Sequence, residues 1–361
     1  MKAYLVLENG MLFEGERFGA GGEVTGELVF TTGMTGYLET LTDPSFYGQI
    51  IVQTFPLIGN YGVIPPDFES STQGACAYIA KYPCMEPSNF RSEGSLDGFL
   101  SERGIIGLCG IDTRALTRLI RENGVMNGRI SGHRPCDSDI EALRSYQLRN
   151  PVLKVSAQAI KLYRADAPKY AVALFDFGAK ENIRRALLAR GCDVWVFPSE
   201  STAEEILAVH PDGIVLSNGP GDPTDNPGAI RCIKTLFKAG VPMLGICLGH
   251  QLMALASGFQ TSKLKYGHRG ANQPVRDIHS GRVFITSQNH GYTVTNESID
   301  PRTAEAWFIN VNDGTCEGIQ YKNAPARSVQ FHPEACPGPE DTAFLFDRFT
   351  QSLEVRKNAV E

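Results

Sequence analysis

The stretch LGICLGHQ at residues 244–251 places a cysteine between an apolar run and the start of an amphipathic segment. The apolar run predicts a buried strand, and the residues after the cysteine predict a helix. Gly245 and Gly249 flank Cys247 as glycines flank the nucleophile of the G-x-S-x-G motif, where a strained turn lifts the side chain clear of the sheet. Cys247 is therefore a candidate nucleophile. A structural cysteine buried at a glycine turn is the alternative, because free cysteines are often buried.

Short apolar strands alternate with amphipathic helices on the N-terminal side of this stretch, from about residue 170. The predicted strands are 171–175, 193–197, 213–216 and 241–246, and the predicted helices are 180–190, 203–209, 227–239 and 251–256. This alternation predicts an α/β domain with an open, mostly parallel sheet. Ligands of such sheets bind beyond the carboxyl ends of the strands. The loops that carry Ser217, Cys247 and His332 are therefore expected to meet at one edge.

The first part of the chain differs in composition and pattern from this α/β region. Residues 1–150 are rich in glycine turns and β-branched or aromatic runs, which predict a β-rich domain. The predicted strands are 3–7, 27–32, 49–54 and 74–79, and a single clear helix begins at Asp112 or Thr113 and ends at Gly124. Residues 151–168 contain two prolines and no firm periodicity. We interpret them as a linker to a second domain at residues 169–361.

Composition excludes several classes of partner. The 361 residues carry a formal net charge of −6 and no dense basic run, so nucleic acid and anionic membranes are poor candidates. The start of the chain lacks the features of a signal peptide, and no apolar run reaches the length of a membrane span. Nine scattered cysteines without a C-x-x-C pair predict reduced thiols and a cytoplasmic location. Seven dispersed histidines show no ligand spacing, so no metal is expected on this chain.

A base and its orienting group follow another predicted strand. Residues 327–331 run into His332-Pro333-Glu334, and residues i and i+2 of an extended segment project to the same side. Glu334 could then hold the imidazole of His332 and stabilise its charged form. A strand that ends at a proline beside a solvated acid is the alternative for this motif alone.

Two further segments have the composition of binding loops. SNGPGDP at residues 217–223 follows a strand, and its glycines permit close approach of the backbone to a ligand, although a plain surface turn is the alternative. The loop lacks the lysine of a Walker A motif. SQNHGY at residues 287–292 combines amides, a glycine and an aromatic ring, which suits a polar substrate. We interpret His290 as structural, because His332 has the better partner.

Taken together, these motifs resemble those of the class I glutamine amidotransferases, and the resemblance covers nearly the whole chain. The superfamily motifs are SNGPGDP at 217–223, GICLGHQ at 245–251 and HPE at 332–334. The small subunits of carbamoyl-phosphate synthetases are indicated by KYGHRGANQPV at 265–275, SQNHGY at 287–292, TGY at 35–37, LTDPS at 41–45 and GIDTR at 110–114.

The resemblance implies a flavodoxin-like second domain and a Cys-His-Glu triad. Cys247 would be the nucleophile, His332 the general base and acid, and Glu334 its orienting group. The implied glutamine-binding residues are Ser45, Gly219, Gly221, Leu248, Gln251, Asn289, Gly291 and Tyr292. Tyr292 stands where many members of the family have phenylalanine.

The resemblance also implies a division of labour between two chains. Glutamine would be hydrolysed on this chain, and ammonia would pass through an internal passage to a separate large subunit. That subunit would bind ATP and Mg²⁺ and form carbamoyl phosphate from bicarbonate, so no cofactor is expected on this chain. Two other functions stay open: hydrolysis of γ-glutamyl or peptide bonds by an elbow cysteine, and a non-catalytic module. The intact triad argues against the second.

Overall fold

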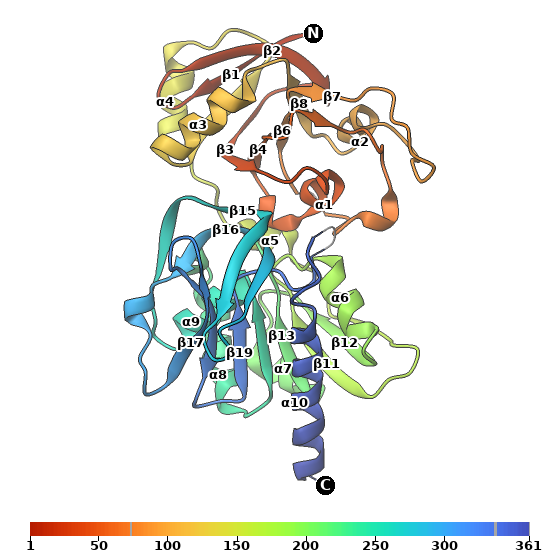
Figure 1. Ribbon diagram of the computed structural model, residues 1–361, viewed down its shortest axis with the longest axis vertical. Coiled ribbons are helices and arrows are strands. Elements are labelled where there is room, and N and C mark those ends of the chain that lie inside the picture. The colour runs from red at the N-terminus through yellow and green to blue at the C-terminus, as the bar shows by residue number, and fades with distance from the viewer. Residues whose placement is uncertain (73, 336–337, 361) are drawn as a thin grey trace. The chain divides into compact units, whose positions relative to one another are not determined.

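The computed structural model describes residues 1–72, 74–335 and 338–360 (Figure 1). They form two compact units, Met1–Pro151 and Val152–Glu361. None of the described helices combines the length and the apolar character needed to cross a membrane.

Seven strands of the first unit close into a barrel. In barrel order they are β1 (Lys2–Leu7), β2 (Leu12–Gly19), β8 (Ile106–Cys109), β6 (Ala77–Ile79), β4 (Gln49–Gln53), β3 (Val24–Thr31) and β9 (Met126–Ser131). Neighbours from β8 to β3 in this order are parallel, and the remaining neighbours are antiparallel. The predicted β-rich character of this region is confirmed, with the sheet closed and mixed.

Both faces of the barrel wall are buried, because successive side chains of a strand point to opposite sides. In β4, Ile50 packs in a cluster with Leu5 and Leu28, whereas Ile51 packs in a second cluster with residues of α1 and α2. The helices of this unit are α1 (Tyr37–Thr42), α2 (Leu96–Glu102), α3 (Thr113–Asn123) and α4 (Asp137–Ser145). Short elements complete it: β5 (Leu57–Ile58), which pairs with β7 (Tyr82–Pro83), and 3₁₀ turns at Pro44–Phe46 and Pro65–Asp67.

The predicted helix of the first unit is confirmed by its caps. The Asp112 side chain accepts a hydrogen bond of 2.9 Å from the backbone N–H of Ala115 at the start of α3. Gly124 ends the helix with a φ of 96°, a conformation that glycine adopts without strain.

The second unit is built on one ten-stranded sheet. Its order is β10 (Lys161–Tyr163), β12 (Cys192–Phe197), β11 (Tyr170–Phe175), β13 (Gly213–Leu216), β14 (Met243–Ile246), β19 (Ala326–Val329), β18 (Cys316–Tyr321), β17 (Ala304–Asn310), β15 (Thr261–Asp277) and β16 (Val283–Val294). The five strands from β12 to β19 are parallel to one another. Numbered among themselves, they have the order 2-1-3-4-5 of a doubly wound sheet.

Helices cover both faces of this parallel centre. Ala173 and Phe175 of β11 pack in the cluster that contains residues of α7, α8 and α9, whereas Val172 and Leu174 pack with residues of α6 and α10. The helices are α5 (Pro151–Val155), α6 (Glu181–Leu188), α7 (Ala203–Ala208), α8 (Pro227–Lys238), α9 (Leu248–Ala256) and α10 (Phe344–Val360), with 3₁₀ turns at Pro223–Asp225 and Asn296–Ser298.

The prediction of a mostly parallel sheet was wrong. β15 to β18 form an antiparallel half that joins the parallel centre through the β18–β19 pair. These strands have weak sequence signals, because the long β15 is partly exposed along much of its length and lacks a clean alternation of apolar and polar residues.

The expected linker at residues 151–168 is an ordered part of the second unit. It contains α5 and β10, and β10 pairs with β12. Val152 and Val155 are buried, and the Ser156 hydroxyl donates to the Asp176 carbonyl at 2.7 Å. These contacts join residues distant in sequence, so local periodicity carries no sign of them.

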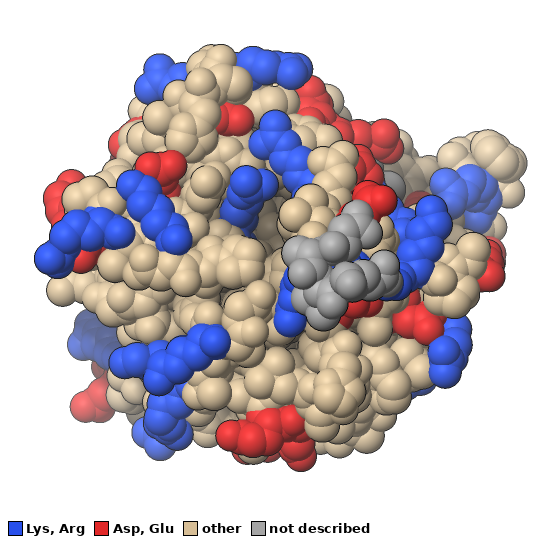
Figure 2. Space-filling view, turned by 90° about the horizontal axis from the view of Figure 1, so that it is seen from below, with Lys and Arg blue, Asp and Glu red and all other residues tan. Residues whose placement is uncertain are grey.

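Charges of both signs mix on the surface. On the face shown in Figure 2, Lys and Arg side chains are interspersed with Asp and Glu side chains over the described residues. This mixture accords with the small net charge of −6.

Candidate active site

Cys247 occupies a strained turn between β14 and α9. Its φ of 53° and ψ of −104° make it one of three described residues other than glycine with positive φ. Such backbone strain costs about 1–3 kcal/mol and persists only where neighbouring contacts enforce it. One such contact is the hydrogen bond of 2.9 Å from the backbone N–H of Cys247 to the carbonyl of Val329. The predicted elbow is therefore present.

Close packing requires the two glycines of the elbow. A Cβ atom at Gly249 would lie 2.4 Å from the carbonyl oxygen of Leu216, and one at Gly245 would lie 2.5 Å from the sulfur of Met253. The N–H of Gly249 donates to the carbonyl of Ser217 at 3.0 Å. α9 can therefore start directly against the end of β13.

The imidazole of His332 is held by Glu334, as predicted, but the two residues lie in a turn after β19 and not in an extended segment: the N–H of Ala335 donates to the carbonyl of His332 at 3.3 Å. Nδ1 of His332 lies 2.7 Å from Oε1 of Glu334, and both side chains are fully buried. The ammonium of Lys180 lies 3.5 Å from the same carboxylate oxygen. A buried carboxylate is thus placed between two groups that carry or accept positive charge.

Electrostatics favour a charged His332 and a charged Glu334. Burial raises the pKa of Glu334, but His332 and Lys180 lower it more, so the net shift is downward. Burial and Lys180 lower the pKa of His332, but Glu334 and Cys247 raise it more, so the net shift is upward. Nε2 of His332 has no hydrogen-bond partner among the described residues. This nitrogen is left for the thiol and for a bound substrate.

The glycine loop at residues 217–223 lies against the loop that carries Lys180. The side chain of Asn218 donates to the carbonyl of Gly178 at 3.0 Å and accepts from the N–H of Lys180 at 3.0 Å. A Cβ atom at Gly219 would lie 2.3 Å from the carbonyl of Phe177 and 2.8 Å from a methyl carbon of Leu248. The predicted residues Gly219 and Leu248 are therefore neighbours at the carboxyl edge of the sheet.

Strand β16 brings the other predicted binding residues to Cys247 and α9. The thiol of Cys247 lies 3.7 Å from the carbonyl of Asn289. The side-chain amide of Gln251 donates to the carbonyl of Tyr292 and to Oε1 of Gln330, each at 2.9 Å. Both N–H groups of the Gln251 amide are therefore used in contacts within the protein, and its oxygen is the atom left for a ligand.

Gly221, Gly291 and Ser45 complete the set of predicted binding residues. Gly221 has a φ of 90°, so its turn requires glycine, and Gly291 lies within β16. Ser45 lies in the first unit, in the 3₁₀ turn at Pro44–Phe46, where its N–H donates to the Asp43 side chain at 2.8 Å. A contact between Ser45 and glutamine stays a prediction.

Sequence reasoning missed two buried residues of the site, Lys180 and Gln330. Lys180 is 8% exposed and Gln330 is fully buried. A lysine at the start of a predicted helix is normally solvated, so local sequence contained no sign of its ion pair with Glu334. The sequence signal that could have indicated Lys180 was its position just after a predicted strand and a polar turn.

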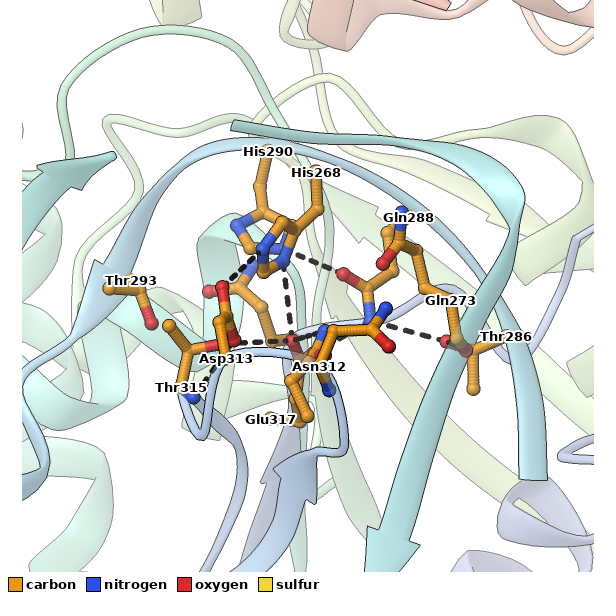
Figure 3. Close-up of polar contacts among 12 residues, drawn as sticks. His268, Gln273, Thr286, Gln288, His290, Thr293, Asn312, Asp313, Thr315 and Glu317 are labelled. Atoms are coloured by element: carbon orange, nitrogen blue, oxygen red, sulfur yellow. Dashed lines mark hydrogen bonds and ion pairs between the residues drawn. The ribbon is translucent and has the colours of Figure 1, made fainter. Parts of the chain in front are cut away.

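A second polar group consists of His268, His290 and Glu317, on β15, β16 and β18 (Figure 3). Each offers one potential metal-ligand atom, and these atoms lie within 4.8 Å of one another. The structural interpretation of His290 agrees with its contacts, because both ring nitrogens face oxygens of its own strand, those of Tyr292 and Gln288.

Two family models match separate parts of the chain. Glutamine amidotransferase class-I matches residues 173–352, and Carbamoyl-phosphate synthase small chain, CPSase domain, matches residues 5–130. Among solved structures, a glutamine amidotransferase from Thermotoga maritima aligns with 52% of this chain and 85% of its own, at 19% identity and a TM-score of 0.38.

Curated relatives match over nearly their full length. The carbamoyl phosphate synthase small chain of Bacillus caldolyticus is 52% identical over 354 residues, which cover 97% of this chain and 96% of the relative. The pyrimidine-specific small chain of Bacillus subtilis is 51% identical over 366 residues, which cover 100% and 98%. Given these matches and the elbow geometry, the chain belongs to the family of carbamoyl phosphate synthase small chains.

Proposed function

We propose that this chain is the glutamine-hydrolysing subunit of a carbamoyl phosphate synthase, with Cys247, His332 and Glu334 as its catalytic residues. The observation that carries the proposal is the buried His332–Glu334 pair, 2.7 Å apart, at the sheet edge that holds the strained Cys247 turn. The names of the relatives support the choice of reaction.

Hydrolysis proceeds in two steps on this geometry. The Cys247 thiolate attacks the side-chain amide carbon of glutamine, and the charged His332 protonates the departing nitrogen. The C–N bond breaks, ammonia leaves, and a γ-glutamyl thioester remains. His332 then takes a proton from water, which attacks the thioester and releases glutamate and the thiolate.

Backbone N–H groups at Gly219 and Leu248 hold the oxyanion that forms in each step. Their neighbourhood at the edge of the sheet supports this role. One such donor contributes about 3–4 kcal/mol to stabilisation of the transition state. The proposed glutamine contacts are Ser45, Gly219, Gly221, Leu248, Gln251, Asn289, Gly291 and Tyr292.

Ammonia is the product that the complex uses. A separate large subunit receives it and, with ATP, Mg²⁺ and bicarbonate, forms carbamoyl phosphate, so this chain needs no cofactor for the hydrolysis. The cytoplasm is the proposed location, and the eight described cysteines, all free thiols, accord with a reducing compartment.

Cys247→Ala tests the division of labour in the reconstituted complex. We expect glutamine-dependent synthesis to fall by at least about 10³-fold, because the nucleophile is lost, while ammonia-dependent synthesis persists. The exposed Cys136 provides the control: Cys136→Ala should change neither rate. Loss of both activities in a correctly assembled Cys247→Ala complex would contradict the proposal.

An electrophilic glutamine analogue tests the nucleophile directly. Peptide mapping should find the label on Cys247 and on no other cysteine. The same preparation distinguishes the alternative hydrolase: cleavage of peptide bonds without release of ammonia from glutamine would overturn the assignment.

A further inference from the structure

Buried polar side chains from three strands meet beside β16, outside the residues that the mechanism uses (Figure 3). His268 lies on β15, Gln288 and His290 lie on β16, and Glu317 lies on β18. Gln288, His290 and Glu317 are at most 5% exposed, and the His268 side chain is 11% exposed. Asp313, in the loop before β18, reaches the same group.

His268 presents one bare nitrogen to this group. Its Nε2 lies 2.9 Å from Oδ2 of Asp313, a carboxylate that accepts the ring N–H. Its Nδ1 has no hydrogen-bond partner among the described residues and lies 3.5 Å from Oε1 of Glu317. Nδ1 of His268 and Oε1 of Glu317 therefore face each other at a distance that one bound cation can bridge.

Both ring nitrogens of His290 face oxygen atoms that act as hydrogen-bond acceptors. Its Nδ1 lies 2.7 Å from the carbonyl of Tyr292, which can only accept, so Nδ1 carries the proton. Its Nε2 is then a lone pair 3.0 Å from another acceptor, Oε1 of Gln288.

The orientation of the Gln288 amide is set by its other contacts. Its nitrogen donates to Oε2 of Glu317 at 2.9 Å and to the hydroxyl of Thr286 at 3.2 Å. That hydroxyl donates in turn to the carbonyl of Gln273 at 2.8 Å. If the Gln288 amide were turned, its nitrogen could donate to Nε2 of His290. Its oxygen would then face Oε2 of Glu317, and two acceptors would again face each other.

We propose that His268 Nδ1, His290 Nε2 and Glu317 Oε1 bind a Zn²⁺ ion, with Gln288 Oε1 as the fourth ligand. The first three residues bring their ligand atoms within 4.8 Å of one another. Two imidazoles and one carboxylate form a common zinc ligand set. One ion would bind both His268 Nδ1 and His290 Nε2, and its two charges would balance those of Glu317 and Asp313.

The hydrogen-bond partners of the two histidine ligands also fit a zinc site. A zinc-bound histidine usually donates its other N–H to a carboxylate or a backbone carbonyl, which are the partners that Asp313 and Tyr292 provide here.

The ion would connect the β15–β16 hairpin to β18. β16 also carries Asn289, whose carbonyl lies 3.7 Å from the Cys247 thiol. A structural ion would therefore steady the strand beside the proposed nucleophile. The sequence-based expectation of no metal relied on ligand spacing, and these ligands come from three separate strands.

Metal binding by the full chain tests the proposal. Apoprotein prepared with a chelator should take up one equivalent of Zn²⁺ and retain it through gel filtration. Bound Co²⁺ should give a visible spectrum without a sulfur charge-transfer band, which separates this site from binding to the cysteines. Asp313→Asn should weaken zinc binding by about 10–100-fold, as expected for a group behind a ligand.

Glu317→Gln distinguishes a bound zinc ion from a network that is held together by added protons. It copies a protonated Glu317, so a proton-based network would leave metal uptake and folding unchanged, whereas a zinc site should lose its equivalent of metal. His268→Gln should lose it as well. His279→Gln is the matched control, because His279 and Glu305 also lie 3.5 Å apart but are half exposed. Wild-type protein that binds no zinc, or variants that bind as wild type does, would overturn the proposal.

Discussion

At the scale of single residues, the charge on His332 depends on burial, on Cys247 and on two neighbours of opposite charge. Glu334 raises the pKa of the imidazole and Lys180 lowers it, and both act on a ring that burial alone would keep neutral. Because His332 must be protonated to release ammonia, the alkaline limit of glutamine hydrolysis should follow its pKa. The two neighbours should therefore move that limit in opposite directions.

Glu334→Gln and Lys180→Gln test this balance. Without Glu334, the pKa of His332 falls and the alkaline limb of kcat/KM should move to lower pH, with kcat reduced by about 10²–10⁴-fold. Without Lys180, that limb should move to higher pH. Glu305→Gln serves as a control, because Glu305 is half exposed beside His279. Shifts of the same sign in the two variants would contradict the assigned roles.

At the scale of elements, the elbow depends on how closely α9 meets the sheet. Gly249 is the second residue of α9, and a Cβ atom there would lie 2.4 Å from a backbone oxygen of β13. Backbone atoms cannot yield as a flexible side chain can. The helix would have to shift, and it carries Leu248 and Gln251 with it.

Gly249→Ala should therefore destabilise the protein by about 1–3 kcal/mol, the usual cost of overpacking. It should also reduce glutamine hydrolysis more than the loss of stability explains. Gly228 is the matched control, because it is the second residue of α8 and faces open space, so Gly228→Ala should be neutral or stabilising by up to about 1 kcal/mol. Urea unfolding and rates of Cys247 labelling measure both effects. Equal behaviour of the two variants would refute this account of the elbow.

At the scale of the whole molecule, the question is whether the barrel unit contributes to glutamine binding. Ser45 is the one proposed glutamine contact in that unit. A single lost hydrogen bond contributes about 0.5–1.5 kcal/mol, so Ser45→Ala should raise KM for glutamine by roughly 2–12-fold with little change in kcat.

Ser131→Ala controls for general damage to the barrel. Ser131 is 1% exposed, and its hydroxyl donates to the carbonyl of His133 at 2.6 Å. This variant should leave KM for glutamine unchanged even if the unit is less stable. An unchanged KM in Ser45→Ala would remove Ser45 from the glutamine site without affecting the triad.

The sequence by itself determined the features that depend on neighbours along the chain. Periodicity located the strands and helices around the parallel centre, two glycines located the turn at Cys247, and the HPE motif placed Glu334 within reach of His332, although through a turn and not an extended segment. Each of these follows from local backbone geometry, which a few adjacent residues specify.

Only the tertiary structure decided the features that join distant segments. Closure of the barrel, the antiparallel half of the second sheet, the Lys180–Glu334 ion pair and the cluster of His268, His290 and Glu317 are all of this kind. Strand pairing and burial create these contacts, and neither leaves a fixed spacing in the sequence. Cys247 was therefore predictable as a candidate nucleophile, whereas the charges and ligands around it required the fold.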